Sequence, residues 1–115
     1  MVLEQKPTTN NEQQTTKNMY LEIVSPEATL FSLEVDSVVV PGVMGEFEML
    51  NNHAPIVSLL KEGLVKIKMH NQDPVDLDEL HPAVVPFPKD ENILTVKINS
   101  GTIELKDNRI IVLAD

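Results

Sequence analysis

The stretch "ILTVKINSGTIELKDNRIIVLAD", residues 93–115, decides the fold class of this chain. Its first part alternates strictly, with Leu94, Val96 and Ile98 on one face of an extended strand and polar residues on the other. This period of two is typical of a half-buried strand, because successive side chains of a strand point to opposite faces. The second part predicts a hairpin with Asp107 and Asn108 at its tip, since both residue types tolerate left-handed backbone in tight turns.

The same pattern of short strands and frequent turns extends upstream to residue 19. A Pro-Gly pair ends one apolar run, and a Glu-Gly pair marks a tight turn between two others; both are turn signals. No stretch combines the length and the 3.6-residue period of a convincing helix. Short strands at this spacing predict an all-β chain, a β-sandwich or a barrel. The strands predicted upstream cover residues 19–25, 29–31, 34–41, 45–50, 56–60 and 65–69.

Two segments depart from the strand pattern. Residues 1–18 are polar and cannot bury enough apolar surface to offset the entropy cost of ordering, so we expect a disordered tail before one domain at residues 19–115. Residues 71–91 carry four prolines and six acidic residues. Because proline removes a donor from a strand ladder, we expect a long excursion there, with the "AVV" piece at residues 83–85 as a candidate edge strand.

Composition limits the functions that are open to the chain. The net charge is −9 and the nine basic residues are scattered, whereas neutralising a phosphate backbone needs clustered lysine and arginine. Nucleic-acid binding is therefore disfavoured, and a basic protein surface is the better electrostatic partner. The lack of cysteine excludes disulfides, thiol catalysis and cysteine-based zinc sites. We find no secretory signal and no apolar run of about 18 residues, so we expect a soluble or peripheral protein.

Candidate catalytic and metal sites are weak. His53, His70 and His81 show no His-x-His pair or face-matched spacing, which favours separate surface histidines over a cupin-type metal site. Glu46 and Glu48 share one strand face, but a solvated face explains them better than an acid and base pair. The nearby glycines are not followed by the Gly-Lys-Ser/Thr of a phosphate loop. The residues by themselves predict a small acidic β-sandwich with a binding or assembly role, without catalytic residues, cofactors or metal ions.

Residues 40–55, "VPGVMGEFEMLNNHAP", carry a more specific signal. A strand, Pro-Gly, Gly-Glu-Phe, Asn-His-Ala-Pro and then a Leu-x-x-Gly turn follow in an order that resembles the N-terminal β-sandwich domain of the epsilon subunit of F-type ATP synthase. The segments "LEIVSPEATLFSLEVDSVVVPG" and "SGTIELKDNRIIVLAD" are similar to that family's first strands and closing hairpin. The resemblance runs from residue 19 to residue 115, apart from the proline-rich excursion.

The resemblance implies a ten-stranded β-sandwich in the central stalk of the rotor. Such a subunit links the gamma subunit to the ring of c subunits and couples proton flow to ATP synthesis without bond chemistry of its own. Its place would be peripheral to the bacterial inner membrane, on the cytoplasmic side. Glu46 matches the family's ring-facing glutamate, and Asn52, His53, Ala54 and Pro55 match the segment beside the gamma and ring contacts.

Four departures from the family pattern bear on these expectations. Glu48 stands where the family has glycine, so its backbone must be either ordinary or strained. Asn51 stands where the family has proline, and residues 71–91 are longer than the family norm. The chain stops at Asp115, where many members continue into a regulatory two-helix hairpin, so we expect no inhibition of ATP hydrolysis by such a hairpin. The alternative is a free-standing ligand-binding β-sandwich module, which would show a concave pocket and no large apolar patch.

Overall fold

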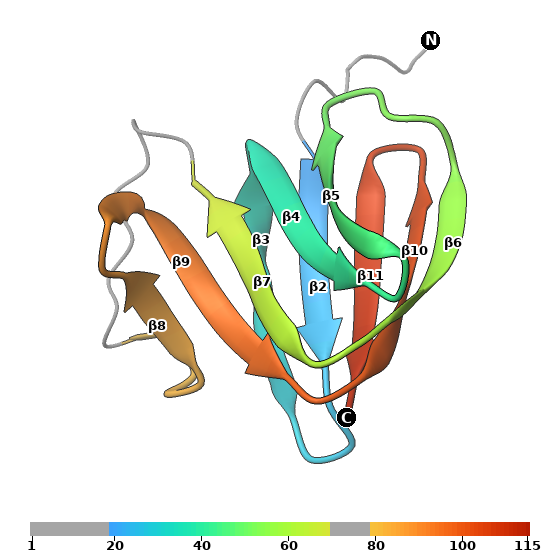
Figure 1. Cartoon of the computed structure of the whole chain (residues 1–115). Helices are drawn as coiled ribbons and strands as arrows, with labels where there is room; N and C mark the ends of the chain where they lie inside the picture. The colour runs from blue at the N-terminus through green and yellow to red at the C-terminus, as the bar shows by residue number, and fades with distance from the viewer. Residues whose placement is uncertain (1–18, 70–78) are drawn as a thin grey trace, which may run out of the picture.

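The computed structural model describes residues 19–69 and 79–115, and most of these lie in strands (Figure 1). The predicted tail at residues 1–18, and residues 70–78 around the start of the excursion, lie outside the described residues. Within the described residues the structure confirms the all-β, ten-stranded prediction. The strands are β2 (Met19–Val24), β3 (Thr29–Val35), β4 (Ser37–Gly42), β5 (Gly45–Leu50), β6 (Ile56–Leu60), β7 (Gly63–Lys68), β8 (Val84–Phe87), β9 (Asp90–Ile98), β10 (Gly101–Lys106) and β11 (Arg109–Ala114).

One continuous hydrogen-bonded ladder folds over into two packed layers. Strands β3-β2-β11-β10-β6 form the β11 layer, and strands β5-β4-β7-β9-β8 form the β4 layer. The two layers are joined where Gly42 of β4 pairs with Leu60 of β6. Strands β2 and β11 run parallel, which places the first and last described strands side by side in one layer. This arrangement is the predicted β-sandwich, closed along one side like a barrel (Figure 1).

The core lies between the layers and consists mainly of branched aliphatic side chains from both. Leu21 and Ile23 face it from the β11 layer, and Val38 and Val40 face it from the β4 layer; all four are fully buried. The burial along β2 alternates residue by residue, as its sequence pattern predicts. A core packed in this way deforms little under load, because its side chains already fill the available space.

The strand predicted at residues 34–41 is wrong, because the structure divides it. Strand β3, predicted to end at Phe31, continues to Val35, and β4 begins only at Ser37. The chain crosses between the layers at Asp36, whose backbone N–H donates a 2.8 Å hydrogen bond to a carbonyl oxygen at the end of β7. Apolar residues continue on both sides of the crossing, so the sequence pattern does not reveal it.

Strands β6 and β7 flank the predicted turn at Glu62 and Gly63, but they separate into different layers. Strand β6 pairs with β10, whereas β7 pairs with β4 and β9. At the corner the Lys61 N–H donates to the carbonyl oxygen of Pro41 at 2.8 Å. This turn therefore changes layer and does not close a hairpin.

The end of the proline-rich excursion is ordered strand. As predicted for the "AVV" piece, β8 is an edge strand, and the Thr95 hydroxyl donates to the carbonyl oxygen of Val85 at 2.8 Å. Pro86 is tolerated there because an edge strand needs ladder donors on one side only. The predicted end of the excursion at residue 91 is wrong, since β9 already begins at Asp90 and pairs back onto Phe87.

Candidate functional site

The turn between β5 and β6 holds four of the five predicted site residues. The His53 N–H closes this β5–β6 turn with a 3.1 Å hydrogen bond to the carbonyl oxygen of Leu50. Asn52 has a left-handed backbone with φ of 67°, and the imidazole Nδ1 of His53 lies 2.7 Å from the carbonyl oxygen of Ala54. Ala54 and Pro55 are exposed. The structure thus presents these four residues together on one surface turn.

The β5–β6 turn rests against the tip of the β10–β11 hairpin. The tip residues Asp107 and Asn108 have φ of 53° and 61°, which confirms the left-handed turn predicted from their types. The Asn108 amide nitrogen donates to the side-chain oxygen of Asn51 at 2.8 Å. In return the Asn52 backbone N–H donates to the Asn108 side-chain oxygen at 2.9 Å. Sequence reasoning treated Asn108 only as a turn former and missed these bonds.

An open hollow of about 320 Å³ lies beside the β5–β6 turn. Its lining offers an imidazole, a carboxylate and two amides, so it can accept a polar side chain of a partner. It encloses little of its volume, whereas small-molecule sites usually bury most of their ligand. In residues 19–69 and 79–115, no three His, Asp or Glu side chains gather as a metal ion requires. The lining residues are Asn52, His53, Pro55, Asp107 and Asn108.

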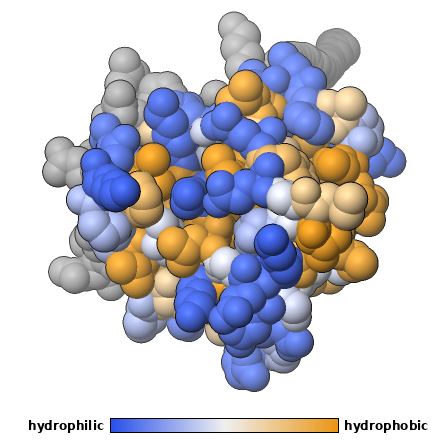
Figure 2. Space-filling model, in the orientation of Figure 1, coloured by the Kyte–Doolittle hydropathy of each residue, from blue (hydrophilic) through white to orange (hydrophobic). Residues whose placement is uncertain are grey.

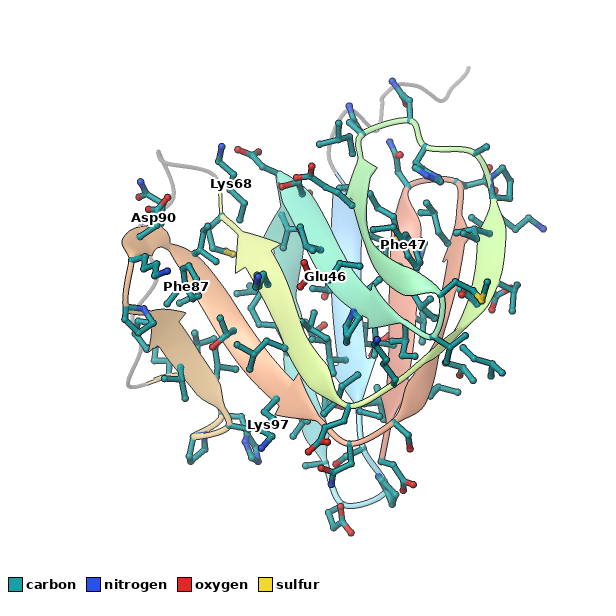
Figure 3. The ribbon with its side chains drawn as sticks, viewed as in Figure 1. Glu46, Phe47, Lys68, Phe87, Asp90 and Lys97 are labelled. Carbon is teal, nitrogen blue, oxygen red and sulfur yellow. The ribbon has the colours of Figure 1, made fainter. Side chains whose placement is uncertain are left out.

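Glu46, the fifth predicted site residue, lies toward the other end of β5. At about 3.3 Å per residue, the stretch from Glu46 to Leu50 alone spans about 13 Å. Glu46 Oε2 lies 3.3 Å from Nζ of Lys66, which belongs to β7 on the far side of β4. Figure 3 shows Glu46 and Phe47 leaving β5 in different directions. The five predicted residues therefore do not form one site: Glu46 is near one end of β5, and the other four follow its opposite end.

Glu48, which replaces a family glycine, sits in β5 without backbone strain. It pairs with Val39 in the regular antiparallel ladder. The described non-glycine residues with positive φ are Asn52, Asp107 and Asn108, and Glu48 is not among them. The backbone at Glu48 is therefore ordinary and not strained, which decides between the two alternatives that the replacement of glycine left open.

The β4–β5 turn is a two-residue loop with a paired glycine on each side. Gly45 has φ of 127°, a backbone conformation that side chains with a Cβ rarely adopt. A Cβ on Gly42 would come within 2.8 Å of the Phe47 ring, so only glycine fits beneath that ring. The two loop residues between them, Val43 and Met44, point outward, and Met44 is 96% exposed. The turn predicted at the Pro-Gly pair is thus explained by the geometry of Gly42 and Gly45.

An exposed apolar strip follows β6, and sequence reasoning missed it. Val57 and Leu59 of β6 are 75% and 60% exposed. Leu113 of β11 lies in the same cross-strand row as Leu59, with one β10 residue between them. The strip continues onto the β4–β5 turn, because the Val43 N–H donates to the carbonyl oxygen of Leu59 at 3.1 Å. We call Val43, Met44, Val57, Leu59 and Leu113 the β6 strip.

The signal for the β6 strip is present in the sequence of the strand. "IVSLL" at Ile56–Leu60 is apolar on both faces, whereas a strand with one face in water alternates between apolar and polar residues. Figure 2 shows hydrophobic side chains gathered at the right of the molecule, where β6 runs in Figure 1. Contiguous exposed apolar surface of this kind marks an interaction site.

Comparisons with known proteins bear on what this surface is for. Residues 18–78 match the family model of the β-sandwich domain of the ATP synthase delta/epsilon chain. The chain belongs to this family. It is 36% identical over 97 residues to the ATP synthase epsilon chain of Campylobacter curvus and 38% identical over 97 residues to that of Campylobacter fetus. Each match covers 84% of this chain and 60% of the relative, so the chain spans about three fifths of the epsilon chains it matches.

Solved structures of ATP synthases contain the same fold. The chain superposes on a chain of the Euglena gracilis mitochondrial ATP synthase with a TM-score of 0.65 at 12% identity, covering 89% of this chain and 53% of that one. It superposes on the central stalk and c-ring structure of the Tetrahymena thermophila enzyme with a TM-score of 0.60 at 11% identity. This delta/epsilon β-sandwich has, among its described residues, no helix that is both long and apolar enough to cross a bilayer.

Proposed function

We propose that this delta/epsilon chain is a rotor subunit that joins the gamma subunit of an ATP synthase to its c-ring. It couples proton flow to ATP synthesis from the cytoplasmic side of the bacterial inner membrane, and it carries no catalytic residue. Membership of the family supports this role. The observation that carries it is the β6 strip, because exposed apolar side chains gathered along β6 and the β4–β5 turn mark an interaction site.

The β6 strip is the face we assign to the gamma subunit. It begins beside Pro55 at the end of the β5–β6 turn and ends at Met44, at the tip of the β4–β5 turn. Val57 and Leu59 project from its middle. An interface with an apolar centre and polar ends is the usual arrangement of a stable contact, because water is excluded from the centre. The β5–β6 turn supplies one polar end.

The c-ring contact is assigned to Glu46. Its side chain is 54% exposed and lies on the outer face of the β4 layer, near the β4–β5 turn. A carboxylate suits a polar loop that carries lysine or arginine. The two assignments put the gamma contact along β6 and the ring contact on the outer face of the β4 layer, with the β4–β5 turn between them.

The alternative function, a free-standing ligand-binding module, is not favoured. Such a module would show a concave pocket and no large apolar patch. The hollow beside the β5–β6 turn is open, and the β6 strip is exposed. Both features fit an assembly subunit better.

The test compares two exposed valines in the complex with the gamma subunit and c-ring of the same organism. Val57 lies in the β6 strip, whereas Val85 of β8 is 53% exposed on the β4 layer. We expect the wild-type chain to form a complex that survives gel filtration. We expect Val57→Asp to weaken it at least about tenfold, because a carboxylate without a partner is buried there, and Val85→Asp to change affinity less than about twofold. No complex with the wild-type chain, or equal loss in both variants, would contradict the proposal.

A further inference from the structure

Three residues with left-handed backbone meet where the β5–β6 turn touches the hairpin tip. They are Asn52, Asp107 and Asn108, with φ of 67°, 53° and 61°. Glycine adopts such a backbone with least strain, and asparagine and aspartate adopt it at a modest cost. A turn requirement alone would thus be met best by glycine. The asparagine at position 108 has a further use, because its side chain turns inward and the residue is only 7% exposed.

The Asn108 side chain uses both ends of its amide on the neighbouring turn. Its nitrogen donates to the Asn51 side-chain oxygen at 2.8 Å, and its oxygen accepts from the Asn52 backbone N–H at 2.9 Å. The backbone of Asn108 is bonded to strand β2, since its carbonyl oxygen accepts a hydrogen bond from the Tyr20 N–H at 2.9 Å. Asn108 therefore ties the β5–β6 turn to β2 and to the hairpin tip, both parts of the β11 layer.

The local bond inside the turn cannot do the same. The His53 N–H bond to the Leu50 carbonyl closes the turn, but both groups belong to the turn itself. It does not join the turn to the hairpin tip. The bonds to Asn108 cross from residues 51 and 52 to residue 108 and add this contact to the attachment that the flanking strands β5 and β6 give.

We propose that Asn108 is a positioning residue, which holds the β5–β6 turn in the orientation that presents His53, Ala54 and Pro55 to the partner. This inference rests on the proposed function, because it identifies the residue that orients the β5–β6 turn for contact with the partner. The role needs one donor and one acceptor at the same position. Asparagine offers both, aspartate keeps only the acceptor, and glycine keeps the left-handed backbone but offers neither.

The experiment measures backbone amide hydrogen exchange at Asn52 and His53 in the purified chain, and affinity for the gamma and c-ring complex. Asn108→Gly keeps the hairpin unstrained but removes the neutral hydrogen bonds of the side chain. We therefore expect exchange at Asn52 to rise about tenfold. We expect affinity to fall about fivefold, because the turn must be reordered on binding. The matched control for exchange is Asp107→Gly, which relaxes the neighbouring left-handed residue and should change exchange at Asn52 less than about twofold. Affinity is not read in this control, because Asp107 lines the hollow beside the β5–β6 turn.

A conservative variant separates positioning from general stability. Asn108→Asp keeps an acceptor for the Asn52 N–H, so protection at that amide should return to within about threefold of wild type, while Asn108→Gly stays unprotected. Unchanged exchange at Asn52 in Asn108→Gly would overturn the inference. Faster exchange with unchanged affinity would show that Asn108 holds the turn but that its orientation does not matter for binding the partner. If the wild-type chain binds no complex, the proposed function fails, and with it the claim that the turn is oriented for binding. The exchange measurement then decides by itself whether Asn108 holds the turn.

Discussion

Glu46 and Lys66 form an ion pair across β4, with 3.3 Å between Oε2 and Nζ. The strand between them brings the two side chains together on the outer face of the β4 layer. Lys66 also lies over the Phe87 ring, 5.6 Å from its centroid, so one lysine touches both the carboxylate and the edge strand β8. Both charged side chains are partly exposed, and pairs of this kind contribute at most about 1 kcal/mol. In the proposed ring contact, a basic group of the c-ring would replace Lys66 as the partner of Glu46.

Glu46→Gln should reduce coupling without unfolding the domain. We expect the midpoint of thermal unfolding to shift by less than about 4 °C, because only an exposed ion pair is lost. Proton-driven ATP synthesis by the reconstituted enzyme should fall by about two- to fivefold, in line with the loss of one charged contact. Glu48→Gln, two residues along the same strand face, is the control. An unchanged synthesis rate with Glu46→Gln would remove Glu46 from the ring interface.

Lys66→Gln should act in the opposite direction. Removing the lysine leaves the Glu46 carboxylate without its internal partner, so its attraction to a basic loop is no longer offset. We expect affinity for the isolated c-ring to increase by about two- to fivefold at low salt. Lys68→Gln, on the same strand and face, should have a smaller effect (Figure 3). Weaker ring binding by Lys66→Gln would mean that the ring contacts Lys66 itself.

The adjacent isoleucines of β11 test which face is buried. Ile110 is 1% exposed and faces the core, whereas Ile111 is half-buried on the outer face. Ile110→Ala should lower the free energy of unfolding by about 2–5 kcal/mol, because it leaves a cavity in a packed core. Ile111→Ala should cost about 1 kcal/mol or less, since its surroundings include water. Urea denaturation measures both, and equal losses would show that the register of β11 is wrong.

Gly42→Ala tests the close contact beneath Phe47. The new methyl group would lie 2.8 Å from both the Phe47 ring and the carbonyl oxygen of Gly45. We expect a loss of about 1–3 kcal/mol in the free energy of unfolding, the usual cost of overpacking. Phe47→Leu in the Gly42→Ala background should restore part of the loss by giving up the ring contact. A Gly42→Ala protein as stable as wild type would contradict this geometry.

The strands could be predicted where the local pattern is sufficient. The β10–β11 hairpin follows from alternation and from two residue types that accept left-handed backbone, and both are properties of neighbouring residues. The crossing at Asp36 could not be predicted, because Val35 and Val38 are both buried and belong to different layers. Residue hydrophobicity indicates burial but not which layer a strand joins.

The candidate site shows the same limit. The order of the chain puts Glu46 inside the predicted strand at residues 45–50 and Asn52–Pro55 after it, yet nothing local shows that they lie on separate surfaces. The β6 strip was readable from a strand that is apolar on both faces, although its extension to Leu113 depends on pairing between β6, β10 and β11.

The sequence by itself determined the strand class, the hairpin tip, the turn at Pro41 and Gly42, and the resemblance to the family, because each depends on short-range backbone preferences or on a contiguous motif. Only the tertiary structure decided that Lys66 pairs with Glu46, that Asn108 bonds to the turn at Asn51 and Asn52, and that Leu113 lies in the same cross-strand row as Leu59. These contacts join residues 20 to 57 positions apart. Their existence depends on strand order and register, which are set by how the whole core packs and not by any one segment.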